Sequence, residues 1–234
     1  TCNGNSDGAI DLSVSGGSGS YSYAWSNGTT SEDLTSLSAG TYSVTVTDNT
    51  CGNTATTSVT ITEPAALVAS ITAVGSSTVC SGSTVTLSIS SGSAAGNTYQ
   101  WSDANGAISG ATSSTYSASA SGTYSVTITT PAGCTATSSG VAVNIVTVSV
   151  PSGLSTSNIE LTKATMNWGA VANAHHYDVR MRVQGTSTWS IALNNLTGTS
   201  FIKTGLTSST TYDWEIRSAC SAGSSSVSAW SATQ

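Results

Sequence analysis

The stretch GTYSVTVT at Gly40–Thr47 decides the fold, and it recurs as GTYSVTIT at Gly122–Thr129. In both copies an apolar residue alternates with Ser or Thr, which places apolar side chains on one face of a strand and hydroxyls on the other. A more distant copy, TYDWEI at Thr211–Ile216, keeps the same period. Internal similarity of this kind predicts three related units of antiparallel strands.

A second match precedes each of the two similar stretches. Residues Tyr23–Gly28 read YAWSNG, and Tyr99–Gly106 read YQWSDANG, so that a Tyr-x-Trp strand runs into a glycine turn in both units. Short alternating runs separated by Gly, Ser, Asn and Asp are typical of β-sandwiches. Four tryptophans at alternating apolar positions are predicted to lie in the cores, namely Trp25, Trp101, Trp168 and Trp214.

The composition also favours an all-β chain. Ser and Thr make up 86 of the 234 residues, and charged residues only 7%. Amphipathic helices need charged residues on their solvent face, so we expect no long helices. No run of 18 apolar residues occurs, and membrane insertion is therefore not expected.

The charges are divided unevenly along the chain. Residues 1–150 hold seven carboxylates and no Lys or Arg, whereas residues 151–234 hold all five cations and four carboxylates, giving the net charge of −6. A nucleic-acid partner is excluded because it needs clustered cations. This change in charge along the sequence marks a domain boundary near residue 150. With short linkers at Thr62–Ala65 and Val148–Pro151, we predict domains at residues 1–64, 65–150 and 151–234.

The five cysteines indicate an oxidising compartment. Cys2 and Cys51 bracket the first unit, and Cys80 and Cys134 bracket most of the second, so we predict a disulfide within each pair. Free thiols or a zinc site are the alternatives, but no C-x-x-C spacing occurs. Cys220 is left over and is predicted to be a small buried residue rather than an intermolecular cross-link.

The N-terminal loop is the one candidate metal site. It offers oxygen ligands at alternate positions before a glycine turn, as calcium loops do: Asn3, Asn5, Asp7 and Asp11. The acid expected at the twelfth position is replaced by Val14, so an ordinary turn into a strand is favoured, and no cofactor is predicted. Asp33 and Asp48 would join a site only if the fold brought them near.

The sequence lacks signs of catalysis. His175 and His176 are adjacent, so on a strand they point to opposite faces and cannot share a metal; both are predicted at the surface. No Gly-x-Ser-x-Gly motif occurs, and no nucleophile, base and acid can be assembled. The chain is predicted not to be an enzyme.

Residues 1–64 resemble the SprB repeat of gliding-motility surface adhesins of Bacteroidota. The resemblance is carried by Thr1–Gly4, Ser6–Ile10, Ser15–Gly19, Tyr21–Gly28, Ala39–Tyr42 and Thr47–Asp48. It implies a structural module of long, secreted cell-surface proteins. Cys51 precedes Gly52 here, whereas the family more often has Gly before Cys.

The rest of the chain resembles two related kinds of module. Residues 65–146 resemble immunoglobulin-like domains through Val79–Gly82, Tyr99–Trp101 and Gly122–Tyr124, and residues 151–234 resemble a fibronectin type III domain. Tyr212, six residues after Leu206, matches the tyrosine-corner position. The resemblance implies three tandem immunoglobulin-like antiparallel β-sandwiches.

Two features of the third module bear on ligand binding. Asp178, Arg180 and Arg182 share the outer face of one strand. In the resembled fold the neighbouring strand presents Asp213, Glu215 and Arg217 outward, so the two sets would form a ladder of charges across the strands. Trp230 is expected to stack on one of these arginines. Trp189 and Trp230 are also the candidate surface platforms for sugar rings, and a self-paired sheet face is the simpler interpretation.

These features predict a non-enzymatic stalk or a repeating filament subunit on a bacterial cell surface. Its expected partners are neighbouring modules, further copies of itself and surface glycans. A carbohydrate-binding accessory region of a secreted enzyme is the alternative. Sequons at Asn27 and Asn195, with the many hydroxyls, are candidate glycosylation sites.

Overall fold

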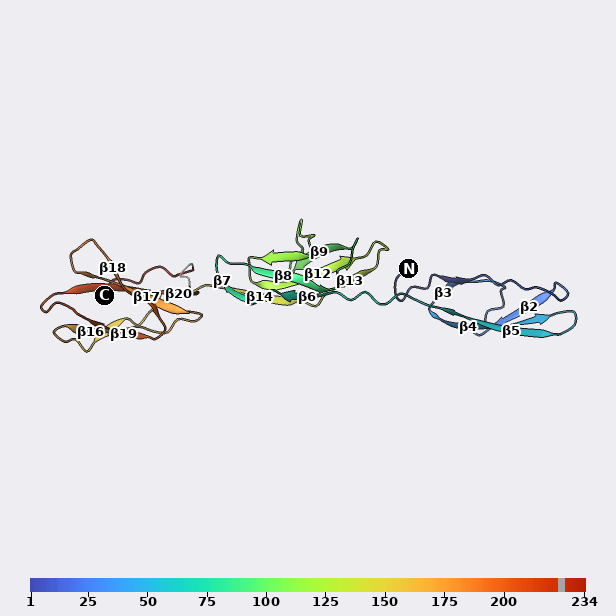
Figure 1. Cartoon of the computed structure of the whole chain (residues 1–234), viewed down its shortest axis with the longest axis horizontal. Coiled ribbons are helices and arrows are strands. Elements are labelled where there is room, and N and C mark those ends of the chain that lie inside the picture. Colours follow the sequence, from blue (N-terminus) through green and yellow to red (C-terminus); the bar gives the residue numbers. More distant parts are fainter. Residues whose placement is uncertain (223–225) are drawn as a thin grey trace. The chain divides into compact units, whose positions relative to one another are not determined.

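The residues that the structure describes form strands, turns and loops, which confirms the predicted all-β class (Figure 1). The computed structural model describes residues 1–222 and 226–234. None of these residues belongs to a helix that could cross a membrane. Contacts divide the chain into two compact units, Thr1–Ile71 with Ile89–Ser114 and Ser125–Gly140, and Thr72–Ser88 with Thr115–Tyr124 and Val141–Gln234.

The N-terminal sheets are formed by the first five strands, in which β1 pairs with β3 while β4 lies between β2 and β5. The strands are β1 (Gly8–Ile10), β2 (Tyr21–Trp25), β3 (Leu34–Leu37), β4 (Gly40–Asp48) and β5 (Thr54–Ile61). Strand β4 contains the stretch that decides the fold. Its Val44 and Val46 pack with Trp25, Leu34 and other apolar residues of both sheets, because they face the same side of the strand.

The middle sheets repeat this plan with β12 in the place of β4. One sheet has the order β11-β8-β6, and the other has β10-β9-β12-β14-β7 with β13 also paired to β12. The strands are β6 (Ser70–Ala73), β7 (Thr78–Cys80), β8 (Val85–Ser91), β9 (Thr98–Asp103), β10 (Gly106–Ala107), β11 (Thr115–Ala118), β12 (Gly122–Thr129), β13 (Thr135–Thr137) and β14 (Val141–Val146). Trp101, Val126 and Ile128 are fully buried.

The C-terminal sheets have the orders β15-β16-β19 and β18-β17-β20. The strands are β15 (Ser155–Ser157), β16 (Lys163–Asn167), β17 (His176–Val183), β18 (Ser190–Leu196), β19 (Ser200–Thr204) and β20 (Tyr212–Ala219). The last residues run beside β20, where the Ser231 N–H donates to Ile216 O at 2.8 Å and the Gln234 N–H to Trp214 O at 3.0 Å. Trp168 and Trp214 lie in one core with Val179 and Ile216.

Equivalent hydrogen bonds show that the sheets are built alike. The Tyr42 hydroxyl donates to Ser38 O, and the Tyr124 hydroxyl to Ala120 O, each at 3.0 Å and each four residues back. At the predicted corner the Tyr212 hydroxyl instead accepts the N–H of Thr207 at 3.0 Å. Each tyrosine therefore fixes the chain where it enters its central strand, as in a tyrosine corner.

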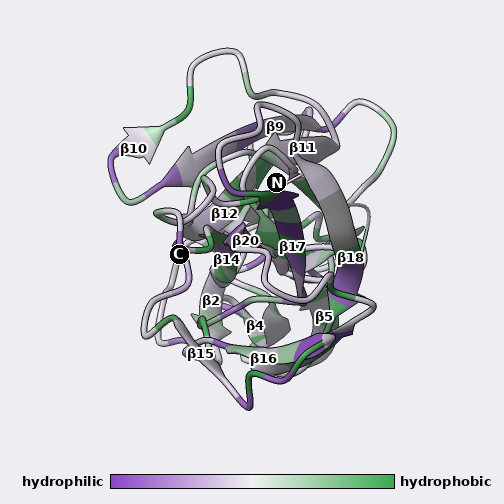
Figure 2. Ribbon diagram, turned by 90° about the vertical axis from the view of Figure 1, so that its left-hand side faces the viewer, coloured by the Kyte–Doolittle hydropathy of each residue, from purple (hydrophilic) through white to green (hydrophobic). Residues whose placement is uncertain are grey.

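The predicted core tryptophans are all buried. Trp25, Trp101, Trp168 and Trp214 are at most 5% exposed. Outside the cores, Figure 2 shows much of the ribbon in pale colours near the middle of the hydropathy scale. This follows from the composition, because Ser, Thr and Gly occupy the solvent-facing positions that charged residues fill in most soluble proteins.

Candidate functional site

The disulfides differ from the predicted pairs. Cys2 is bonded to Cys134, with 5.5 Å between their Cα atoms, and Cys80 is bonded to Cys220, with 5.8 Å. Cys51 is free and exposed. The predictions of Cys2–Cys51, of Cys80–Cys134 and of an unpaired Cys220 are therefore wrong.

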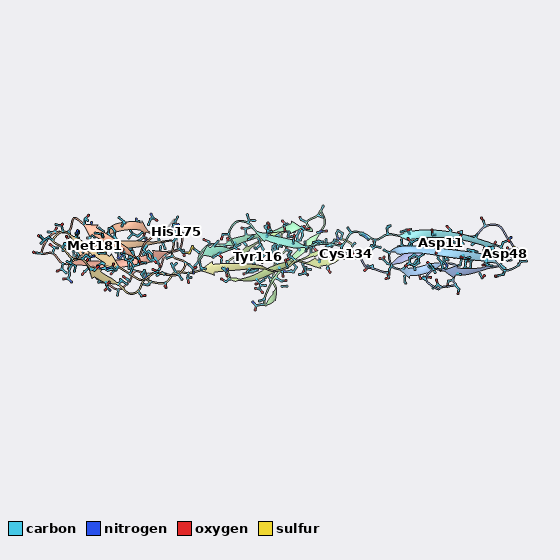
Figure 3. The ribbon with its side chains drawn as sticks, turned by 90° about the horizontal axis from the view of Figure 1, so that it is seen from below. Asp11, Asp48, Tyr116, Cys134, His175 and Met181 are labelled. Carbon is cyan, nitrogen blue, oxygen red and sulfur yellow. A yellow bond between two sulfur atoms is a disulfide. The ribbon has the colours of Figure 1, made fainter. Side chains whose placement is uncertain are left out.

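The length of the strands explains why the predicted pairs cannot form. Cys51 lies in the turn between β4 and β5, whereas Cys2 lies beside the chain that leaves β5, since the Asn3 side-chain amide donates to Pro64 O at 3.0 Å. The eight residues of β5 span about 26 Å, and a disulfide needs Cα atoms roughly 4.4–6.8 Å apart. In Figure 3, Asp11 lies between Cys134, to which Cys2 is bonded, and Asp48, which precedes the turn that holds Cys51.

The same geometry separates Cys80 from Cys134. Cys80 pairs with Val146 at the end of β14, whereas Cys134 immediately precedes β13. The N-terminal and the middle sheets thus each carry one cysteine at the end where the chain leaves and another in the turn that follows the tyrosine-bearing strand, whereas residues 151–234 carry only the second kind, Cys220. Cysteines at opposite ends cannot bond to each other, but they can bond to cysteines of the neighbouring sheets.

The candidate calcium loop makes contacts other than those of a metal site. The Gly4 N–H donates to the Glu63 carboxylate at 2.5 Å, and the Asn5 N–H to Cys2 O at 3.1 Å. Asp33 accepts the Leu12 N–H at 3.0 Å. Within residues 1–222 and 226–234, no three His, Cys, Asp or Glu side chains are placed to hold a metal ion together. The preference for an ordinary turn that leads into β1 stays a prediction.

Asp48 joins two loops of the N-terminal sheets. Its carboxylate accepts the N–H and the hydroxyl of Ser18, both at 2.7 Å, and the N–H groups of Thr50 at 2.8 Å and Cys51 at 3.3 Å. The Ser18 hydroxyl, followed by these backbone N–H groups, holds the pKa of Asp48 well below its ordinary value, because each bond favours the ionised form. A Cβ on Gly17 would lie 2.6 Å from an Asp48 oxygen, so this position requires glycine.

The predicted ladder of charges on β17 and β20 is present. The strands place Asp178, Arg180 and Arg182 directly opposite Arg217, Glu215 and Asp213. The arginine Nε atoms donate to the facing carboxylates at 2.8 Å for Arg180, 2.9 Å for Arg182 and 3.1 Å for Arg217. These pairs are partly buried and directly opposite, which is the geometry in which cross-strand ion pairs stabilise a sheet.

Trp189 and Trp230 lie over this ladder. Trp189 has the guanidinium carbons of Arg180 and Arg182 at 4.7 Å and 4.2 Å from its ring centroid. Trp230 has those of Arg180 and Arg217 at 4.3 Å and 4.7 Å. Arg180 is thus shared by both rings. The stacking predicted for Trp230 is observed, and cation–π contact within the sheet accounts for both tryptophans without a bound sugar.

The two histidines differ in burial. His175 is exposed, but His176 is fully buried, so its predicted surface position is wrong. Its Nε2 lies 3.5 Å from Asp178, which also accepts from Arg217. His176 pairs with Ala219 at the end of β20, and the first four residues of β17 are all buried, so that both faces of the strand are covered at this end. Because both His176 and Arg217 contact the carboxylate of Asp178, His176 joins the ladder of charges.

The two sequons lie at the surface. Asn27 is exposed, and its side-chain oxygen accepts the Thr29 N–H at 3.2 Å and the Thr29 hydroxyl at 2.7 Å. Asn195 is exposed and has a left-handed backbone with φ 64°. Both side chains are accessible to a glycosylating enzyme.

Comparison with known proteins found one family match and similar solved structures. Residues 1–30 match the SprB repeat family. The SprB-type resemblance predicted for the N-terminal sheets is confirmed over these residues, which include the Cys-x-Gly turn at Cys2 and strands β1 and β2. No curated protein matches the chain.

Two solved structures are similar to the chain. A crystal structure of consecutive titin domains is 14% identical with a TM-score of 0.48, and the match covers 98% of this chain and 97% of that chain. A segment of two fibronectin type III domains from chicken tenascin is 16% identical with a TM-score of 0.35, covering 65% of this chain and 90% of that chain. The SprB repeat is the match that bears on function.

Proposed function

We propose that the chain is a non-enzymatic structural and adhesive segment of a secreted bacterial cell-surface protein, acting as an adhesin stalk or as the repeating subunit of an extracellular filament. The proposed modules are residues 1–64, 65–150 and 151–234. The SprB match supports the cell-surface assignment, because such repeats are associated with surface proteins. The observation that carries the proposal is the pair of overlapping disulfides.

The two disulfides connect modules that succeed one another. Cys2 and Cys134 are 132 residues apart, and Cys80 and Cys220 are 140 residues apart, so the second loop begins inside the first. A chain under tension transmits force through its shortest covalent path, and these bonds shorten that path. Most of the protein is therefore shielded from extension even when its strands separate, which suits a part that bears load.

The surface chemistry suits an extracellular position. Disulfides persist in oxidising compartments. Residues 1–150 contain no Lys or Arg, so trypsin-like proteases have no cleavage site there. Exposed Asn27, Asn195 and hydroxyl groups can carry glycans, and the proposed partners are neighbouring modules, further copies and surface glycans.

Electron microscopy of intact cells tests the proposal. Gold-labelled antibody raised against residues 1–234 is expected to mark surface fibres or stalks, at a regular axial spacing if the chain is a filament subunit. A strain that lacks the gene is the control and should lose both label and structures. Label confined to the cell interior, or surface structures unchanged in that strain, would overturn the proposal.

A further inference from the structure

Cys51 occupies the position of a cross-linked cysteine in a repeating pattern. The pattern is visible because both disulfides join the same two kinds of turn, one at each end of a module. The inference rests on the proposed division into modules, and it concerns the cysteine to which the first module, residues 1–64, is bonded.

The first kind of turn begins with Cys-x-Gly. Cys2 and Cys80 start two such turns, in which the Asn5 N–H donates to Cys2 O at 3.1 Å and the Ser83 N–H to Cys80 O at 3.0 Å. The glycines have φ values of 79° at Gly4 and 86° at Gly82, in the left-handed region that favours glycine. The two turns are therefore closed in the same way.

Both Cys-x-Gly turns lie against the chain that leaves their module. The Cys2 turn contacts the segment after β5, where the Gly4 N–H donates to Glu63. The Cys80 turn contacts the end of β14, where the Ser81 N–H donates to Val146 O at 2.8 Å. These two cysteines stand at the exit end, from which the next module follows.

The second kind of turn follows the strand that carries the tyrosine. Cys134 lies in the turn after β12 and Cys220 in the turn after β20. The first turn is closed by Thr130 N–H to Cys134 O at 2.9 Å, and the second by Cys220 N–H to Ser226 O at 2.9 Å. Each bonds to the Cys-x-Gly cysteine of the module before it.

Cys51 lies in the corresponding turn of the first module. This turn follows β4 and is closed by Asp48 N–H to Asn53 O at 2.9 Å. The Asp48 carboxylate holds the Cys51 N–H at 3.3 Å, so the loop that presents the thiol is fixed. The thiol is exposed. Both of its counterparts are disulfide-bonded, so the position is one that this architecture uses for cross-links between modules.

We propose that Cys51 forms a disulfide with the cysteine of a Cys-x-Gly turn in another β-sandwich module, outside residues 1–234. Residues 151–234 contain no Cys-x-Gly, and the two such cysteines of the chain are already bonded, so a second copy does not supply the partner. Two thiols form one S–S bond and release two protons and two electrons. The electrons reduce the disulfide of a thiol–disulfide oxidoreductase to its dithiol.

The test is a disulfide map of the native protein. Cells are treated with an alkylating reagent before lysis, and the protein is digested with pepsin without reductant and analysed by mass spectrometry. The expected result is a peptide containing Cys51 joined to a foreign peptide that contains Cys-x-Gly. A Cys51 that is alkylated, joined to a second Cys51 or joined to a cysteine in any other context would overturn the inference.

A variant provides the control. In cells expressing Cys51→Ser the joined peptide should disappear, whereas Thr50→Ser, a change at the exposed neighbouring residue, should retain it. Reduction shows the source of the partner, because the apparent mass of the protein on a denaturing gel falls to that of the single chain only if the partner belongs to a separate polypeptide. Loss of Cys2–Cys134 and Cys80–Cys220 from the same map would contradict the proposed function, whereas their presence with a free Cys51 would contradict this inference alone.

Discussion

The contour length of the unfolded chain depends directly on which cysteines are paired. With both disulfides intact, the shortest covalent path runs through residues 1–2, back through residues 134–80 and out through residues 220–234. This path contains roughly 70 residues, which extend to about 240 Å at ~3.5 Å per residue. After reduction all 234 residues extend, to about 820 Å.

Single-molecule stretching measures this length. The Cys51→Ser variant is attached through peptide tags at its two ends, so that no thiol is needed, and is pulled with and without reductant. We expect full extension near 240 Å without reductant and near 820 Å with it. If Cys2 were bonded to Cys51 and Cys80 to Cys134, the oxidised chain would reach about 465 Å. That value, or a length unaffected by reductant, would refute the load-bearing role of the two bonds.

Three further outcomes follow from individual contacts. Because the pKa of Asp48 is lowered, its carboxylate stabilises the fold at pH values above the ordinary carboxyl pKa of 3.8, and this stability is lost as the pH falls toward the lower folded-state pKa. Asp48→Asn should therefore lower the melting temperature of the N-terminal sheets at pH 7, and the difference between the variant and the parent protein should become smaller at low pH. The control Asp11→Asn should leave the melting temperature unchanged at both pH values. Arg180→Ala should destabilise the C-terminal sheets by about 1–3 kcal/mol in urea unfolding, because it leaves the buried Glu215 without its arginine. The control Lys163→Ala removes an exposed ion pair and should cost at most about 1 kcal/mol. Equal effects of the two substitutions would contradict the importance of the ladder. Tryptophan fluorescence should not change when soluble glycans are added, and a saturable change that Trp189→Phe abolishes would favour the carbohydrate-binding alternative.

The sequence was sufficient for the strands and insufficient for the cross-links. Period-2 alternation reports directly which side chains face the core, so β4, β12 and β20 and the four buried tryptophans followed from local patterns. The charge ladder also followed, because opposite residues on paired strands have a fixed register once the fold is known.

The disulfides required distances that a sequence does not contain. Cysteines that bracket a unit predict a bond that closes it, but an intervening strand separates Cys2 from Cys51 by far more than a disulfide spans. The shared Cys-x-Gly at Cys2 and Cys80, and the position of Cys51, Cys134 and Cys220 after tyrosine-bearing strands, were the signals that could have indicated pairing between units. The burial of His176 had no such signal, because both faces of β17 are covered at its start and the alternation of residues along a strand does not reveal this.

A tryptic digest without reductant tests the bonds between modules most directly. After denaturation with thiols blocked, trypsin leaves residues 1–163 as one fragment, because they contain no earlier Lys or Arg, and releases residues 218–234 after Arg217. With Cys80 bonded to Cys220, the two fragments should remain joined and should separate only on reduction. Recovery of residues 218–234 as a separate peptide with an alkylated Cys220 would contradict the cross-linked architecture.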